Sequence, residues 1–203
     1  MSNISFNPMV TSQPYGTFTD STQGYYQGDF VDDPSSYQWL AAGQIGSGVT
    51  QPIWGGMALT ETVPSVGEGN LGNTITLASA AGNVTGISTF LKNGAAIITA
   101  GLNNVPQLTA GMTVNFFRFG SQARIKVAAE ASLVASLEGG AINAALFWDP
   151  ALQQLTASGT AGAFALPATT KVLSVNTNSK VVSYNSGTGA VTWGNGAVAV
   201  IQI

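Results

Sequence analysis

Beyond residue 50 the chain is a succession of short apolar segments rich in Val, Ile, Thr and aromatic residues. Runs of Gly and Asn, such as 67–70 and 194–196, separate these segments. Short strands with turn residues at regular spacing are typical of β-sandwiches and β-barrels. The pattern therefore predicts an all-β body, a Gly-rich sandwich or barrel, over residues 51–203. Its expected strands are 53–59, 74–77, 95–102, 113–119, 124–128, 144–148, 171–176, 180–184, 190–193 and 197–203.

The clearest hairpin lies near the C-terminal end of the chain. Residues 181–184 and 190–193 alternate apolar and hydroxyl-bearing side chains on either side of a five-residue turn. This alternation predicts one apolar face and one hydroxyl face. A similar alternation over 124–127 places Arg124 and Lys126 on a solvent or interface face.

The segment 128–137 supports two interpretations. Its Ala, Glu, Leu and Ser content favours a helix by intrinsic propensity. Short β segments on both sides and two glycines after it are equally consistent with a strand followed by a turn. The sequence alone leaves both open.

The first fifty residues have no sustained period, but they carry single aromatic residues among Gly, Pro, Ser, Thr and Gln. A disordered tail would be poor in aromatic residues. We therefore expect an extended N-terminal arm over residues 1–50 that packs on a larger surface, either the protein's own body or a partner. Its aromatic residues are Phe6, Tyr15, Phe18, Tyr25, Tyr26 and Phe30.

Within this arm, one short helix is predicted at about residues 33–42. Asp33 is a suitable N-cap, Pro34 occupies the first helical position, and Gly43 follows the expected end. The acidic pair Asp32 and Asp33 would also complement the helix dipole. Capping accounts for Asp33, and no glycine-punctuated ligand loop follows, so we expect no metal site there.

Charge is scarce in this protein and unevenly distributed. Of the 203 residues 45% are hydrophobic, and only 7% are charged, against about 25% in a typical domain. The first 91 residues contain six acidic residues and no Lys or Arg, whereas residues 92–203 carry a net charge of +3. The polar surface must therefore consist mainly of neutral amides and hydroxyls.

Composition excludes several classes of function. There is no Cys and no His, which excludes thiolate nucleophiles, cysteine zinc sites and Ser-His dyads. Six Lys and Arg are too few for a basic, phosphate-neutralising stripe, so we expect no nucleic-acid partner. No apolar run approaches the roughly 20 residues that span a bilayer, and the N-terminus lacks signal-peptide features. We expect no membrane association, no cofactor and synthesis in a cytoplasm.

Two alternative functions remain open at this point. A glycoside hydrolase needs two carboxylates and no His, and Glu130, Glu138 and Asp149 are the candidates. A carbohydrate-binding or adhesive module, as on a fibre or tail, could use Trp54, Trp148 or Trp193 with neutral amides, although strand alternation would bury most of these rings. We expect no enzyme, because Asp149 and Glu138 stand at expected turns, and nine acidic residues in one chain make some such pair unavoidable.

An assembly protein accounts for more of the sequence at once, since sparse charge lowers the cost of burying large areas between subunits. Three segments also resemble the N-terminal signature of the structural cement family of short-tailed bacteriophages, within residues 24–62. They are 27–34 (QGDFVDDP), 40–43 (LAAG) and 51–61 (QPIWGGMALTE).

The resemblance implies a capsid decoration protein on the outer surface of the virion head. Such a protein would bind the major capsid protein, bridge neighbouring capsid subunits and stabilise the shell without catalysis. We expect a homo-oligomer, with a trimer as the favoured state. The candidate capsid or subunit interface is Phe6, Tyr15, Phe18, Tyr25, Tyr26, Phe30, Asp33, Pro34, Trp54, Gly55 and Gly56.

Overall fold

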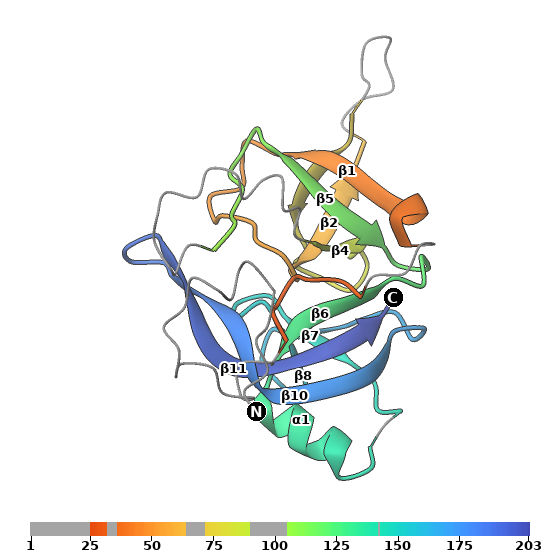
Figure 1. The fold of residues 1–203 in the computed structure, drawn as a ribbon. Helices are drawn as coiled ribbons and strands as arrows, with labels where there is room; N and C mark the ends of the chain where they lie inside the picture. The colour runs from red at the N-terminus through yellow and green to blue at the C-terminus, as the bar shows by residue number, and fades with distance from the viewer. Residues whose placement is uncertain (1–24, 32–35, 64–71, 90–104, 142) are drawn as a thin grey trace, which may run out of the picture.

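A computed structural model of the chain describes residues 25–31, 36–63, 72–89, 105–141 and 143–203. These residues form a closed five-stranded barrel, in the order β1-β3-β2-β4-β5, and a six-stranded sheet, in the order β10-β11-β6-β8-β7-β9. The two lie against each other (Figure 1). The predicted all-β fold is confirmed, with a barrel as its closed unit. The expected strand over 95–102 lies outside the described residues.

The barrel is closed by β1 (Leu40–Ile45), which pairs antiparallel with β5 (Thr113–Arg118) and parallel with β3 (Thr74–Leu77). Between β3 and β5, β2 (Ala58–Thr62) and β4 (Gly86–Ser88) complete the ring through antiparallel pairs. Along β1 every second residue is buried, as expected of a strand with one face inside a barrel.

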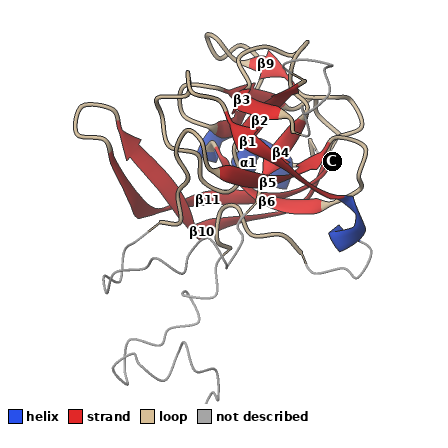
Figure 2. Cartoon of the chain, turned by 90° about the horizontal axis from the view of Figure 1, so that it is seen from above, coloured by secondary structure: helices blue, strands red, loops and turns tan. Residues whose placement is uncertain are grey.

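The second sheet is built on the long hairpin of β10 (Lys171–Asn185) and β11 (Ala190–Gln202), whose tip projects from the body (Figure 2). Next to β11 lies β6 (Arg124–Ala129), followed by the short strands β8 (Gln154–Thr156), β7 (Phe147–Asp149) and β9 (Phe164–Ala165). The predicted hairpin is confirmed, because Asn185 pairs with Ala190 and Val182 pairs with Trp193.

One of two buried clusters joins the barrel to the sheet. Phe117 and Ile87 of the barrel belong to the same buried cluster as Ile125 and Trp148 of the sheet. The helix α1 (Ala131–Glu138) closes that cluster with Leu133, Val134 and Leu137. It also settles the segment left open by the sequence, in favour of a helix. A second cluster fills the barrel interior and extends to the apolar face of the hairpin.

The predicted helix over 33–42 is wrong at its C-terminal end. A 3₁₀ helix, η2, covers only Ser36–Trp39, and Leu40–Ile45 is the barrel strand β1. Gly43 is not a helix cap: a Cβ there would lie 2.6 Å from Cγ1 of Ile75 in β3. Pairing with β3 and β5 overrides the local helix signals. The first barrel strand therefore lies before residue 50, within the segment that was expected to be the arm.

Several strand boundaries also differ from the prediction. The expected strand 53–59 begins only at Ala58, because Ile53 makes an isolated bridge to Leu108 and a tight turn follows at Gly56. The expected strands 171–176 and 180–184 are one continuous strand, β10, with a local irregularity between Asn176 and Ser179. The expected turn at 194–196 is absent, since β11 runs through it. Long strands absorb such bulges without ending.

Candidate functional site

Residues 25–31 form a strap that lies across the six-stranded sheet. Its backbone pairs first with β10, where Lys180 N donates to Tyr25 O at 2.8 Å and Gln27 N donates to Lys180 O at 2.9 Å. It then pairs with β6, where Val31 N donates to Arg124 O at 2.9 Å. Because β10 and β6 flank β11, the strap spans three strands.

The strap crosses the turn at Gly55 and Gly56 with almost no space between the two backbones. A Cβ on Gly28 would lie 2.4 Å from both Cα and C of Gly55, and Gly28 has a φ of +85°. Gly56 has a φ of +83°, and a Cβ there would lie 3.1 Å from Lys126 O. Both positions require glycine for their conformation and for the close approach. Two of the segments that carry the family resemblance thus meet in space.

Polar side chains fasten the strap on both sides of this crossing. Lys126 Nζ is 2.5 Å from Asp29 Oδ2 and 5.8 Å from the centre of the Tyr25 ring. Gln27 is 1% exposed, and its Oε1 accepts a hydrogen bond from Val182 N at 2.8 Å. The Tyr25 hydroxyl is 2.8 Å from Ser174 Oγ. Lys126 therefore faces the strap of its own chain, while Arg124 is exposed, as expected for a solvent face.

Most candidate interface residues within the described part of the chain make contacts inside the chain. Phe30 packs edge-on against Phe117 at 5.6 Å, and Trp54 is buried beneath Tyr184 at 6.1 Å. Tyr26 alone among them is largely open, 49% exposed, with its ring edge-on to Trp193. For residues 25–31 the surface that the arm covers is the protein's own body. The candidates outside the described residues are Phe6, Tyr15, Phe18, Asp33 and Pro34.

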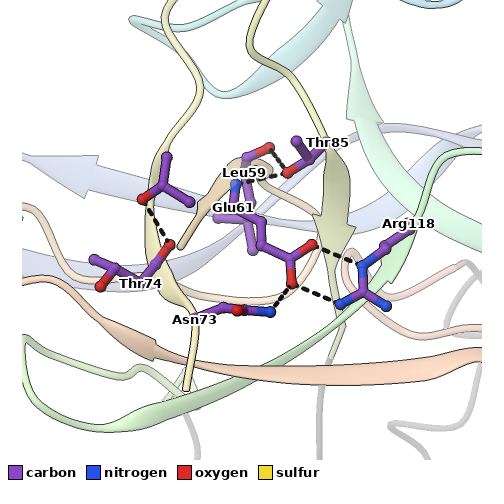
Figure 3. A network of polar contacts seen from close by, with 7 residues as sticks. Leu59, Glu61, Asn73, Thr74, Thr85 and Arg118 are labelled. Carbon is purple, nitrogen blue, oxygen red and sulfur yellow. Dashed lines mark hydrogen bonds and ion pairs between the residues drawn. The ribbon is translucent and has the colours of Figure 1, made fainter. Parts of the chain in front are cut away.

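A polar network on the outside of the barrel was not expected from the sequence (Figure 3). Arg118 of β5 donates to both carboxylate oxygens of Glu61 in β2, at 2.7 and 2.6 Å, and Asn73 donates to the same group. The Arg118 hydrogen bonds lower the pKa of Glu61, and the Arg118 charge and the Asn73 amide add to this. The network connects β2, β5 and Asn73, the residue before β3, and a local sequence pattern does not reveal such a contact.

Replacing Glu61 with Gln is expected to lower the free energy of unfolding at pH 7 by about 1 kcal/mol, since Arg118 is half-exposed and solvent screens the pair. The folded-state pKa lies below the unfolded value. The stabilisation is therefore present above about pH 5 and lost as the pH falls through the folded-state pKa. Urea unfolding from pH 7 to 3 measures this, and the exposed Glu138→Gln is the control. An unchanged pH profile in Glu61→Gln would contradict the role of the network.

The three carboxylates considered for glycoside hydrolysis have local structural partners or lie apart. Asp149 is buried and accepts hydrogen bonds from Ala151 N and Leu152 N, which cap the turn after β7. Thr156 donates to Glu130, and this bond lowers the pKa of that carboxyl. Glu130 and Glu138 lie at opposite ends of α1, about 12 Å apart along its axis, beyond the separation that paired glycosidase carboxylates use.

A cleft of about 440 Å³ opens beside the Trp54 turn. The start of α1, the turn at 151–154 and the β10–β11 hairpin form its walls. Its polar and aromatic lining includes Gln51, Trp54, Glu130, Gln153, Tyr184 and Asn195. Gln153 has the left-handed φ of 53°, which is uncommon for a residue with a side chain.

Over the described ranges there is no group of three or more His, Cys, Asp and Glu side chains that could hold a metal ion. In that same part of the chain, no helix is both long enough and apolar enough to cross a membrane. No protein-family model matches the chain, and comparison with curated proteins finds no similar sequence.

Proposed function

We propose that this protein is a phage capsid decoration protein that binds the outer surface of the assembled head. It bridges neighbouring major capsid subunits without catalysing a reaction, and it acts as a homo-oligomer, a trimer. The observation that carries the proposal is the strap crossing. Gly28 in the first resembling segment and Gly55 in the third form one close contact, so the residues behind the resemblance to the structural cement family act as a single structural unit.

The position of the strap also supports a capsid contact made through the arm. Tyr25, the first residue of the strap, pairs with Lys180 of β10, the strand at one edge of the sheet. Tyr26, half-exposed beside Trp193, provides apolar area there for a partner surface. An arm and a rigid body that contact different capsid subunits resist their separation, and many such copies multiply the effect.

Purified protein added to decoration-free heads of the encoding phage is expected to cosediment with them, even in about 1 M NaCl, where the Debye length is about 3 Å. An interface resting on few ion pairs depends little on salt, and the chain carries only 7% charged residues. Release from heads by moderate salt alone would contradict this interface.

Variants tested in the same cosedimentation assay measure how much the arm and the body each contribute to head binding. Deletion of residues 2–24, which leaves the strap intact, and Tyr26→Ala should each weaken head binding, while Met112→Ala, an exposed apolar control on the barrel, should not. Electron microscopy of decorated heads should then show trimeric density on the outer surface. Undiminished binding after both changes would overturn the arm-mediated contact, and absence of any density on the head would overturn the proposed function.

A further inference from the structure

The cleft beside the Trp54 turn has a lining unlike the rest of the core. Aromatic rings come from Trp54 and Tyr184, and side-chain amides come from Gln51, Gln153, Gln154 and Asn195. Its single side chain that is charged at neutral pH is Glu130, and the lining contains no Lys or Arg. A cleft with one carboxylate and no cation disfavours an anionic ligand, whereas neutral amides and rings suit a neutral polar one.

Two buried polar atoms in the wall lack a partner. Among the described residues, Trp54 Nε1 and Gln153 Oε1 make no hydrogen bond, although their side chains are only 4% and 2% exposed. The Gln153 amide is oriented by Nε2, which donates to Pro150 O at 2.8 Å. A buried donor or acceptor without a partner costs stability, so a group that pairs with it gains that free energy. Indole N–H donates and amide oxygen accepts, and a hydroxyl group can serve either.

The strands around the cleft do not suit an extended peptide. Val181–Tyr184 and Asn195–Ala197 contribute to the lining, but β11 pairs with β10 on one side and with β6 on the other. The outer edge of β10 is occupied beside the cleft, where Lys180 and Val182 bond to the strap. An extended peptide is bound through a free strand edge. Discrete hydroxyl groups on a compact ring need no such edge.

We propose that this cleft binds a neutral saccharide of one or two pyranose rings. The sugar face lies against the Tyr184 ring, while hydroxyl groups pair with Gln51, Gln153 and the Trp54 indole. The Trp54 and Gln153 atoms are covered from solvent, so the sugar reaches them after a side-chain shift of the kind common on binding. The inference is independent of capsid binding, and each test can fail without the other.

Titration of the full-length, ¹⁵N-labelled protein tests the proposal. The probes are glucose, galactose, mannose, N-acetylglucosamine and their disaccharides, with glucuronic acid as an acidic comparison. The chain has four Trp residues, so four indole signals report separately. We expect at least one neutral sugar to shift the Trp54 indole and the Gln153 side-chain amide saturably, with Trp39 and Trp148 unchanged. No saturable shift with any neutral sugar, or tighter binding of glucuronic acid, would overturn the proposal.

Two cleft variants are used, so that the proposal is still tested if one of them fails to fold. Gln51→Ala and Tyr184→Ala should each weaken the best sugar about tenfold, the loss expected for one hydrogen bond or one ring contact. Trp39→Ala, on a residue 60% exposed outside the cleft wall, should leave the affinity unchanged. Unaltered affinity in a folded Gln51→Ala or Tyr184→Ala variant, or an equal loss in Trp39→Ala, would place any sugar binding elsewhere and overturn the assignment.

Discussion

Gly28→Ala is expected to lower the free energy of unfolding by about 3 kcal/mol or more. The new methyl group would lie 2.4 Å from backbone atoms of Gly55, and backbone cannot move aside as a flexible side chain can. The residue would also have to hold a φ of +85°, which costs about 1 kcal/mol for alanine. Strap and turn would therefore have to separate. Urea unfolding at pH 7 measures the change.

Gly111→Ala separates the two causes in that result. Gly111 has nearly the same φ, +84°, but a Cβ there would meet nothing within 4 Å. Its replacement should lower the free energy of unfolding only by the cost of holding alanine at a positive φ, about 1 kcal/mol. Equal losses for the two variants would show that the crossing of strap and turn is not a close contact.

Phe117→Ala is expected to lower the free energy of unfolding by about 3–5 kcal/mol, as for other large aromatic residues removed from a core. Phe117 is fully buried in β5, packs against Phe30 of the strap and belongs to the cluster shared with the sheet. Its loss should therefore destabilise barrel, strap and sheet together. A single unfolding transition, seen by both tryptophan fluorescence and far-ultraviolet circular dichroism, is the expected observation.

Phe119→Ala provides the comparison, because this residue is only half-buried at the edge of the same cluster. The free energy of unfolding should fall clearly less in Phe119→Ala than in Phe117→Ala. If Phe117→Ala instead produced two transitions, of which only one moved, the barrel and the sheet would be independent units and the shared core would be refuted.

The strands that local pattern predicted best are those whose two faces differ. In β3 (Thr74–Leu77) and in the first four residues of β5 (113–116), apolar and polar residues alternate within the strand itself, so the prediction needed only neighbouring residues. The C-terminal hairpin was predictable for the same reason, with Val182 and Trp193 on one face. The period of 2 is a property of the single strand, so it can be read from the sequence without knowing which strands pair with it.

The start of the barrel shows where local pattern misleads. Asp33, Pro34 and Gly43 have the spacing of helix caps, and Ala41 and Ala42 favour a helix by propensity. These preferences are small for each residue, whereas β1 gains hydrogen bonds to β3 and β5 and buries Ala41 and Ile45. The tertiary pairing therefore decides the conformation of this segment.

By itself the sequence determined the all-β class, the C-terminal hairpin and the shortage of charge, because these depend on composition and on neighbours along the chain. Only the tertiary structure decided that Gly28 meets Gly55, that Arg118 braces Glu61, and that Trp54 and Gln153 share one cleft. Each of these pairs joins residues 27 or more positions apart. Such contacts arise from the packing of whole strands, which the local order of apolar and polar residues does not encode.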